Sequence, residues 1–358
     1  MPTAHSAIAP PLIAWQQRAG RHDLPWQAHR TPYRVWVSEI MLQQTQVVTV
    51  IPYYERFMQR FPDVACLAVA PLDEVLHLWS GLGYYARARN LHRSAQRVCS
   101  EFGGEFPVSF EALASLPGIG RSTAGAILAL SRGARHAILD GNARRVLSRY
   151  FGVEGAVDEP DTRARLWELA ERCTPQAQLP EYTQAIMDLG ATVCVRRRPR
   201  CAQCPLHVGC LARRTARQHE LPAPRRPAFR PRRRAFMVVA LEESGSVLLE
   251  RRPESGVWGG LWCLPEFTTA SAATAFIRDT LGVLEDVPRP LAALEHAFTH
   301  FDLTITPLLV QCTGTTFLVE EGRGLWYNLR EPARIGLPAP VSTLLARLSD
   351  ETLFDRRP

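Results

Sequence analysis

The chain has 358 residues and a mass of 40.1 kDa, enough for two or three domains of ordinary size. Hydrophobic residues make up 46% and charged residues 22%, which is typical of a globular protein and argues against an intrinsically disordered one. The net charge of +7 and the pI near 9.1 permit a polyanionic partner such as nucleic acid without identifying one.

The absence of lysine and of long apolar runs narrows the classes of protein that this chain can belong to. All 42 basic residues are arginines, so chemistry that needs a lysine amine is excluded. No apolar run reaches the roughly 18 to 20 residues of a membrane span, and residues 1–11 lack the basic start and apolar centre of a signal peptide. We therefore expect a cytoplasmic protein with no membrane partner.

Residues 7–190 have a helical pattern throughout. Apolar residues recur at spacings of three and four in several segments, which prolines and glycines separate: residues 35–61, 72–79, 124–130, 146–151 and 166–173. Within the first of these, Glu39 is a charged residue among Val35, Ile40 and Leu42. An acid in such surroundings is costly unless it is paired or used, although a position on a polar stripe is the plain alternative.

The segment 113–131 predicts two helices joined by a tight Pro-Gly-Ile-Gly turn, with the second helix beginning at Arg121 or Ser122. Glycines allow the sharp turn, and the amides of the turn and of the helix start then form an anion site. Gly118, Gly120, Arg121 and Ser122 are therefore candidates for binding a DNA phosphate. A plain helix–helix connection is the alternative.

Asp140 follows an apolar run and precedes a predicted helix over residues 143–151. Capping that helix is the commonest duty of an aspartate in this place. Close to a phosphate-binding hairpin, Asp140 also becomes a candidate active-site carboxylate.

Four of the nine cysteines lie close together with the spacing C-x6-C-x2-C-x5-C: Cys194, Cys201, Cys204 and Cys210. Four thiolates can hold zinc or a [4Fe–4S] cluster, and the single C-x2-C pair modestly favours iron–sulfur. The other five, which lie in apolar stretches, are expected to be small buried hydrophobes.

The second half of the chain has a different character. Residues 213–234 are rich in arginine and proline and predict an extended linker, which could touch phosphates or could be a solvated tether. Beyond Ala235, residues 236–241, 247–251 and 301–311 predict strands, and residues 272–281 predict one helix. We expect a smaller α+β domain there.

Together, the hairpin, Asp140 and the cysteine spacing resemble the endonuclease III superfamily of helix–hairpin–helix DNA glycosylases. The similarity to its MutY branch is carried by Leu24-Pro25-Trp26, residues 37–47 and residues 81–87. This resemblance implies a helical glycosylase domain at 1–218, with the hairpin at 113–131 and a [4Fe–4S] cluster at 194–210. A linker at 219–234 and a Nudix-like lesion-recognition domain at 235–358 would follow.

The resemblance also implies an activity, the removal of adenine mispaired with 8-oxoguanine or guanine in double-stranded DNA by a monomeric enzyme. Glu39 would protonate the adenine, Asp140 would stabilise the sugar cation, and Asn142 would orient Glu39 or a water molecule. Trp26, Ser122 and Gln184 would line the adenine pocket. Since Ser122 stands where endonuclease III has its lysine, the enzyme should hydrolyse the base without cutting the strand.

Recognition of the opposite base is implied for a second group of residues: Gln44, Thr45, Leu82, Tyr84, Thr299 and His300. The glycines that flank Leu82 and Tyr84 favour an exposed loop tip over core packing. After residues 259–262 the chain lacks the paired glutamates that hold magnesium in Nudix hydrolases, so we expect a lesion sensor there and no pyrophosphatase.

Two alternative hypotheses about the function remain open. The first is a thymine or uracil mismatch glycosylase of the same superfamily. Three features argue against it: residues 43–46, Gln184 and the appended β domain. A non-catalytic DNA-binding protein stabilised by zinc is the other, and it would need neither Glu39 nor Asp140.

Overall fold

A computed structural model describes residues 8–223, 229–283, 287–312 and 323–350. The chain divides into two compact units, and each is discontinuous in sequence. Unit 1 combines residues 1–69 with 90–226, and unit 2 combines residues 70–89 with 227–358. The predicted boundary after residue 218 therefore falls inside unit 1.

Unit 1 is helical. Its elements are α1 (Ala9–Ala19), η2 (Pro25–Gln27), α2 (Pro32–Leu42), α3 (Val47–Arg60), α4 (Val64–Val69), most of α6 (Ala86–Phe102), α7 (Phe110–Ala114), α8 (Arg121–Arg132), α9 (Gly141–Phe151), α10 (Pro160–Cys173), α11 (Leu179–Thr192), η3 (Cys201–Gln203) and α12 (Leu211–Arg214). Helix α11 packs against α1, α8 and α9, and α2 packs against α8. Side chains such as Trp36, Phe57 and Leu147 fill the core between these helices.

The apolar segment 35–61 is not one helix. Helix α2 ends at Leu42 and α3 begins at Val47, and Gln44 between them has φ +59°. A non-glycine residue in this left-handed region is uncommon and is held there by its surroundings. The turn places Gln44 on the exposed surface.

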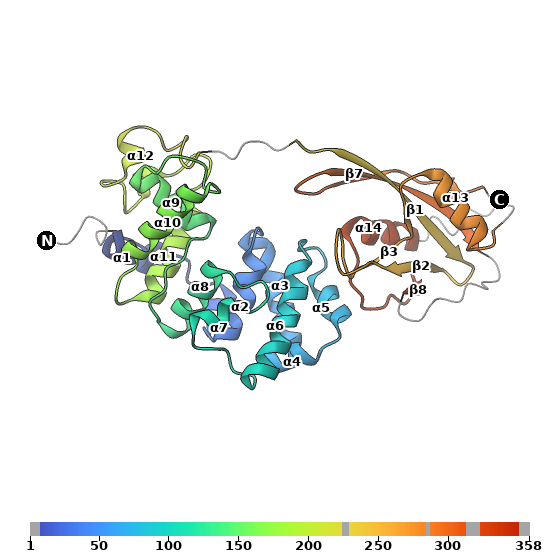
Figure 1. Cartoon of the computed structure of the whole chain (residues 1–358), viewed down its shortest axis with the longest axis horizontal. Coiled ribbons are helices and arrows are strands. Elements are labelled where there is room, and N and C mark those ends of the chain that lie inside the picture. The colour runs from blue at the N-terminus through green and yellow to red at the C-terminus, as the bar shows by residue number, and fades with distance from the viewer. Residues whose placement is uncertain (1–7, 224–228, 284–286, 313–322, 351–358) are drawn as a thin grey trace. The chain divides into compact units, whose positions relative to one another are not determined.

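Unit 2 contains a mixed sheet covered by helices. Its elements are α5 (Leu72–Trp79), β1 (Arg232–Glu242), β2 (Ser246–Arg251), β3 (Trp262–Cys263), β4 (Glu266–Phe267), α13 (Ala270–Asp279), β5 (Arg289–Pro290), β6 (Leu294–Ala297), β7 (Asp302–Cys312), β8 (Gly324–Asn328) and α14 (Ala339–Ser349). The described strands form one sheet with the order β3-β2-β1-β7-β5, in which β1 and β7 are parallel (Figure 1). Strand β4 pairs with β1, β6 with β7 and β8 with β2, all antiparallel.

The core of unit 2 explains its strand pattern. Val238 and Ala240 of β1 and Leu308 and Val310 of β7 point to one face, where Ile277 of α13 covers them. Alternation of buried and exposed positions along a strand produces such a face. Helix α13 begins and ends two residues earlier than the predicted range 272–281. Thr269 sets its start, because its side chain accepts from the amide of Ala272.

The stretch predicted as a linker has ordered ends. Leu221 is buried in unit 1, and β1 begins at Arg232. Residues 224–228 of that stretch lie outside the described residues. Five cysteines were predicted to be buried. The structure buries three of them, Cys173, Cys263 and Cys312. The prediction was wrong for Cys66 and Cys99, which are half-buried.

Candidate active site

Glu39 lies on α2, whose other side chains are largely buried. Protein atoms surround its carboxyl group, although the residue keeps some contact with solvent. Burial and, to a lesser extent, the nearby negative charge of Asp140 together raise the pKa of Glu39 from its ordinary 4.5 to about 8. Glu39 is therefore protonated at neutral pH and can donate a proton.

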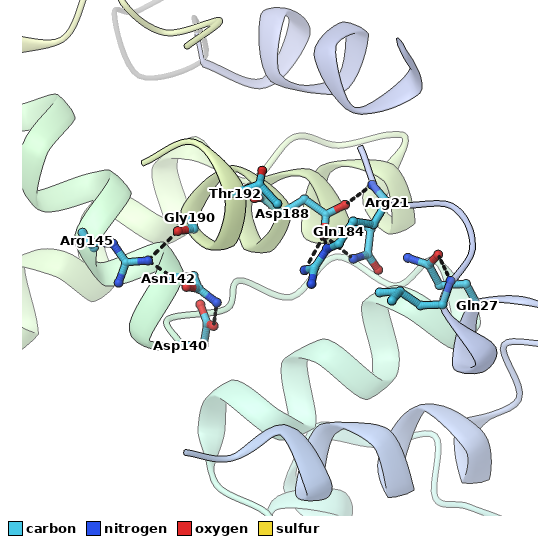
Figure 2. A network of polar contacts seen from close by, with 10 residues as sticks. Arg21, Gln27, Asp140, Asn142, Arg145, Gln184, Asp188, Gly190 and Thr192 are labelled. Carbon is cyan, nitrogen blue, oxygen red and sulfur yellow. Dashed lines mark hydrogen bonds and ion pairs between the residues drawn. The ribbon is translucent and has the colours of Figure 1, made fainter. Parts of the chain in front are cut away.

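Asp140 is the N-cap of α9, as the sequence predicts for an aspartate in that place. Its Oδ1 accepts from the amide of Ala143 at 2.7 Å, and its Oδ2 accepts from Nδ2 of Asn142 at 3.1 Å. These two bonds fix the carboxylate against the helix start, and Figure 2 shows the one from Asn142. The site thus contains one protonated acid and one charged, immobilised carboxylate.

Ser122 supports the chain that leads to Asp140. Its Oγ accepts from the amide of Leu139 at 3.0 Å, so this hydroxyl is engaged within the protein. The bond ties the first turn of α8 to the residue before Asp140. The role of Ser122 in an adenine pocket stays a prediction.

The hairpin between α7 and α8 has an open helix start. Gly118 has φ +79°, and a Cβ on it would come within 2.9 Å of Asn90, so only glycine fits there. Gly120 is the N-cap of α8, and a Cβ on it would meet nothing within 4 Å. The first amides of α8 can accordingly receive an anion.

Arg121 has partners of its own within unit 1. Its Nη2 lies 3.1 Å from Oε1 of Glu171, and its guanidinium stacks on Trp167 at 3.9 Å from the ring centroid. Because these contacts are exposed, a phosphate could replace the carboxylate. The predicted phosphate contact therefore requires an exchange of partners.

A chain of polar contacts runs from Asp140 through Asn142 and Arg145 to Gly190 (Figure 2), and Arg145 extends it to Cys194. Asn142 Oδ1 accepts from Nη2 of Arg145 at 2.8 Å, and the same nitrogen donates to the carbonyl of Gly190 at 2.6 Å. Arg145 Nε donates to the carbonyl of Cys194 at 2.6 Å. Asn142 is thus held from both sides.

The four cysteines of the predicted cluster line a common cavity at one end of unit 1, together with Arg149 and His207. Burial and, to a lesser extent, the other three cysteines raise the pKa of Cys204 to about 12, because neighbouring thiolates without a bound cation would repel one another. Arg149, which is 3% exposed, donates from Nη1 to Sγ of Cys194 at 3.3 Å. Within the described ranges, no three His, Cys, Asp or Glu side chains are spaced for a single metal ion.

Gln184 and Trp26, predicted for the adenine pocket, are both buried. Trp26 packs edge-on against Tyr54, with ring centroids 5.3 Å apart. Gln184 Nε2 donates to Oδ1 of Asp188 at 3.0 Å (Figure 2). Asp188 in turn is held by Arg21.

The residues predicted for opposite-base recognition divide between the two units. Unit 1 holds Gln44, which is exposed, and Thr45, which is half-buried. Unit 2 holds Leu82, Tyr84, Thr299 and His300, and there the structure brings two of them together, because Tyr84 Oη lies 3.2 Å from Oγ1 of Thr299.

The loop around Leu82 corrects one expectation. Tyr84 is 48% exposed, as predicted, but Leu82 is only 5% exposed and does not form a loop tip. Its carbonyl accepts from Nη2 of Arg87 at 3.1 Å and its amide donates to Trp79, so the chain folds back and buries the side chain. Tyr84 has φ +48°, a second non-glycine residue in the left-handed region.

Sequence reasoning missed the charged residues that support this site: Arg21, Arg145, Arg149 and Asp188. Asp188 carried a readable signal, because it is an acid inside the apolar run 185–190, just as Glu39 is inside its own. Arg145 and Arg149 lie four residues apart on one helix face. Their partners are carbonyl groups far away in the chain, which no local pattern reveals.

Comparison with known proteins shows the class of protein to which this fold and site belong. Residues 37–172 match the HhH-GPD superfamily of base excision DNA repair proteins, and residues 236–347 match the NUDIX domain. The solved structure of a thermostable thymine-DNA glycosylase is similar to 59% of this chain and 97% of that one, with a TM-score of 0.54 and 28% identity. The protein is a helix–hairpin–helix base excision repair glycosylase with a Nudix-like domain.

Similarity over nearly the whole chain specifies the branch. The adenine DNA glycosylase of Buchnera aphidicola subsp. Acyrthosiphon pisum is 38% identical over 93% of this chain and 95% of its own length. The human adenine DNA glycosylase is 34% identical over 87% of this chain and 70% of its own length. The chain therefore belongs to the adenine DNA glycosylase family. No helix in the described ranges is both long and apolar enough to cross a membrane.

Proposed function

We propose that this protein releases adenine from double-stranded DNA where adenine is mispaired with 8-oxoguanine or guanine. The observation that carries the proposal is the pair of carboxyl groups in unit 1. Glu39 has its pKa raised to about 8 by burial and by Asp140, whereas Asp140 is a charged, hydrogen-bonded cap. Pairs of acids with opposite protonation states are the device by which glycosidic bonds are broken at neutral pH.

In the proposed mechanism, adenine leaves the base stack and enters the pocket beside Glu39. Glu39 donates its proton to the base, which turns a poor leaving anion into a neutral leaving group. As the bond to C1′ breaks, positive charge develops on the sugar, and the carboxylate of Asp140 stabilises it. Water then attacks C1′ and its proton returns the carboxylate of Glu39 to the acid form, so that the products are adenine and an abasic site.

The chain contains no lysine, so a Schiff base with the sugar would have only the N-terminal amine available. Ser122 occupies the position where the lysine would be, and its hydroxyl is already bonded to the amide of Leu139. We therefore expect a monofunctional glycosylase.

Cys194, Cys201, Cys204 and Cys210 would hold a [4Fe–4S] cluster. Their shared cavity and the Arg149 guanidinium beside Cys194 suit an anionic group with thiolate ligands. When bound, the cluster would tie the segment 194–210 to α9. Arg149 also donates to the carbonyls of Val195 and Leu221, so it would hold both the cluster loop and the chain that follows it.

Tyr84 and Thr299 support the assignment of unit 2 to sensing the opposite base. An exposed tyrosine in a strained conformation, bonded to an exposed threonine from the loop before β7, is suited to contact DNA. We further propose that the protein works as a monomer on the chromosome in the cytoplasm.

The test is single-turnover cleavage of a duplex that holds adenine opposite 8-oxoguanine or guanine, with and without alkali. Strand breaks only after alkali would establish adenine release without lyase activity. Release of thymine from a thymine mispair in place of adenine would overturn the proposal and favour the activity named for the similar thymine-DNA glycosylase. Iron and sulfide analysis of the purified protein tests the cluster, and full zinc occupancy without iron would contradict it.

A further inference from the structure

Asp188 is a charged residue completely buried in unit 1 that the mechanism above does not use. It lies on α11, one turn beyond Gln184, and its side chain is 0% exposed. An ionised carboxylate in such a place must be paired and hydrogen-bonded. The hydrogen-bond partners of Asp188 therefore indicate its role.

Arg21 neutralises Asp188. Arg21 follows α1, and its Nε and Nη2 lie 2.7 and 2.6 Å from Oδ1 of Asp188. The amide of Arg21 donates to Oδ2 at 2.9 Å. A carboxylate paired with a guanidinium in this way offers only acceptor oxygens to its other neighbours.

The remaining bond to Asp188 comes from Gln184. Its Nε2 donates to Oδ1 at 3.0 Å, and Gln184 itself is 4% exposed (Figure 2). A glutamine amide has a donor end and an acceptor end that can exchange by a rotation of about 180°. An acceptor-only carboxylate permits one orientation, with Nε2 toward Asp188 and Oε1 away from it. No hydrogen bond within the described residues engages Oε1.

We propose that Asp188 is a specificity-positioning residue, which locks the Gln184 amide so that the base pocket presents an acceptor, Oε1, and selects a purine with an amino group at position 6. The inference rests on the proposed function and on the expectation that Gln184 lines the adenine pocket. In adenine joined to the sugar, the only N–H donors are those of the 6-amino group. Hypoxanthine has an oxygen at position 6. This oxygen and Oε1 are both acceptors, so they would repel each other and form no hydrogen bond.

The experiment compares adenine with hypoxanthine and with purine, which lacks any group at position 6, each opposite 8-oxoguanine. Single-turnover rates are measured for the full-length protein and for Asp188→Leu. Because each variant is judged by its adenine-to-hypoxanthine ratio, the different intrinsic reactivities of the two bases cancel in the comparison. We expect Asp188→Leu to lower this ratio about tenfold, since the freed amide can turn its Nε2 toward the oxygen of hypoxanthine.

Three variants separate positioning from a merely structural role. Asp188→Asn can keep an acceptor beside Arg21 and Gln184, so its ratio should stay within about threefold of wild type. Thr192→Val removes a 2.8 Å bond to the carbonyl of Asp188 without touching the carboxylate, and its ratio should not change. Should Asp188→Leu fail to fold, Asp188→Ser replaces it, because water beside a serine can donate to or accept from the amide.

The outcomes are distinct. An Asp188→Leu or Asp188→Ser protein that is slower on all three bases by the same factor would overturn the inference and leave Asp188 as a structural ion-pair partner. A wild-type protein that releases no adenine would instead overturn the proposed function. A lower ratio in Asp188→Leu together with the retained ratio in Asp188→Asn would establish the amide lock.

Discussion

At Glu39, the surroundings of one side chain set its protonation state. Burial acts first and the charge of Asp140 second, and both disfavour the ionised form. A glutamate with its pKa at about 8 is an acid at the pH of the cell, while an ordinary one is a base. Both the rate of base release and the stability of the fold should therefore depend on pH.

Glu39→Gln should abolish adenine release, since an amide cannot supply the proton. In the wild-type protein, the single-turnover rate should hold up below pH 8 and fall about tenfold per pH unit above it, as the proton is lost. A pH series with rapid quenching measures this. Glu101→Gln, at an exposed glutamate paired with Arg97, is the control and should change neither rate nor profile.

The same pKa predicts an effect on stability. Between pH 4.5 and 8, folded Glu39 holds a proton that the unfolded chain has released, so wild-type stability falls as the pH rises through this window. Glu39→Gln has no group that titrates at this position, so its stability lacks this dependence on pH. Its free energy of unfolding should match that of wild type at pH 4.5 and exceed it by roughly 1 kcal/mol or more at pH 8. Equal stabilities at pH 8 would show that the carboxyl group is not perturbed.

Asp140→Asn separates charge from capping. Asparagine still offers an oxygen to the amide of Ala143, so α9 should keep its cap and the protein most of its stability. Base release should be lost because the cation has no counter-charge. Asp140→Ala removes the cap too, and should cost a further ~1 kcal/mol in denaturant unfolding. An active Asp140→Asn enzyme would contradict the assignment.

Sequence reasoning found Glu39 and Asp140 because each departs from its local pattern. It missed Arg145 and Arg21, whose partners are the carbonyls of Gly190 and Cys194 and the carboxylate of Asp188. An arginine in a helix or loop is most often solvated, and only the packing of α9 and α1 against α11 places these two beside acceptors. Long-range pairing of this kind is not encoded in spacing.

At the scale of elements, the two glycines of the hairpin do different work. Gly118 needs both its positive φ and the room that a Cβ would take beside Asn90, whereas Gly120 needs neither. Gly118→Ala should therefore destabilise the protein by about 1 kcal/mol or more and weaken DNA binding, while Gly120→Ala should retain stability. Thermal unfolding and binding to an uncleavable duplex measure both effects. Equal stability losses would refute this division of roles.

Helix and strand positions were largely predictable from periodicity, as α8, α9 and β7 illustrate. The exceptions have physical causes. The break between α2 and α3 occurs in the polar run Gln43–Gln46, which contains no proline or glycine. Leu82 was expected at a loop tip because of its flanking glycines, but hydrogen bonds from Arg87 fold that loop back.

At the scale of the whole molecule, the chain is not divided as its sequence suggests. Residues 70–89 are embedded in the helical half of the sequence, yet they form part of unit 2. There, Asp73 pairs with Arg251 and accepts from Nε1 of Trp262, and Tyr85 donates to the carbonyl of Leu337. The β-rich half completes a unit that includes a piece of the first half.

This arrangement predicts the outcome of truncation. A fragment of residues 1–226 would leave α5 and the Tyr84 loop without the partners that bury Leu76 and Tyr85 in unit 2. We expect the fragment to unfold at a lower temperature than the full chain and to expose apolar surface, which dye binding would report. A change in lesion preference of the fragment would then not identify a sensor.

Point variants test the sensor more cleanly. Thr299→Val and Tyr84→Phe each remove the 3.2 Å bond while leaving unit 2 folded, and each should lower the preference for 8-oxoguanine over guanine severalfold. Because both break the same bond, the double variant should lose little more than either single one, which a double-mutant cycle on single-turnover rates would reveal. Thr274→Val, on the exposed face of α13, is the matched control. Additive losses would mean that Tyr84 and Thr299 contact DNA independently, and unchanged preference would leave unit 2 with a supporting role only.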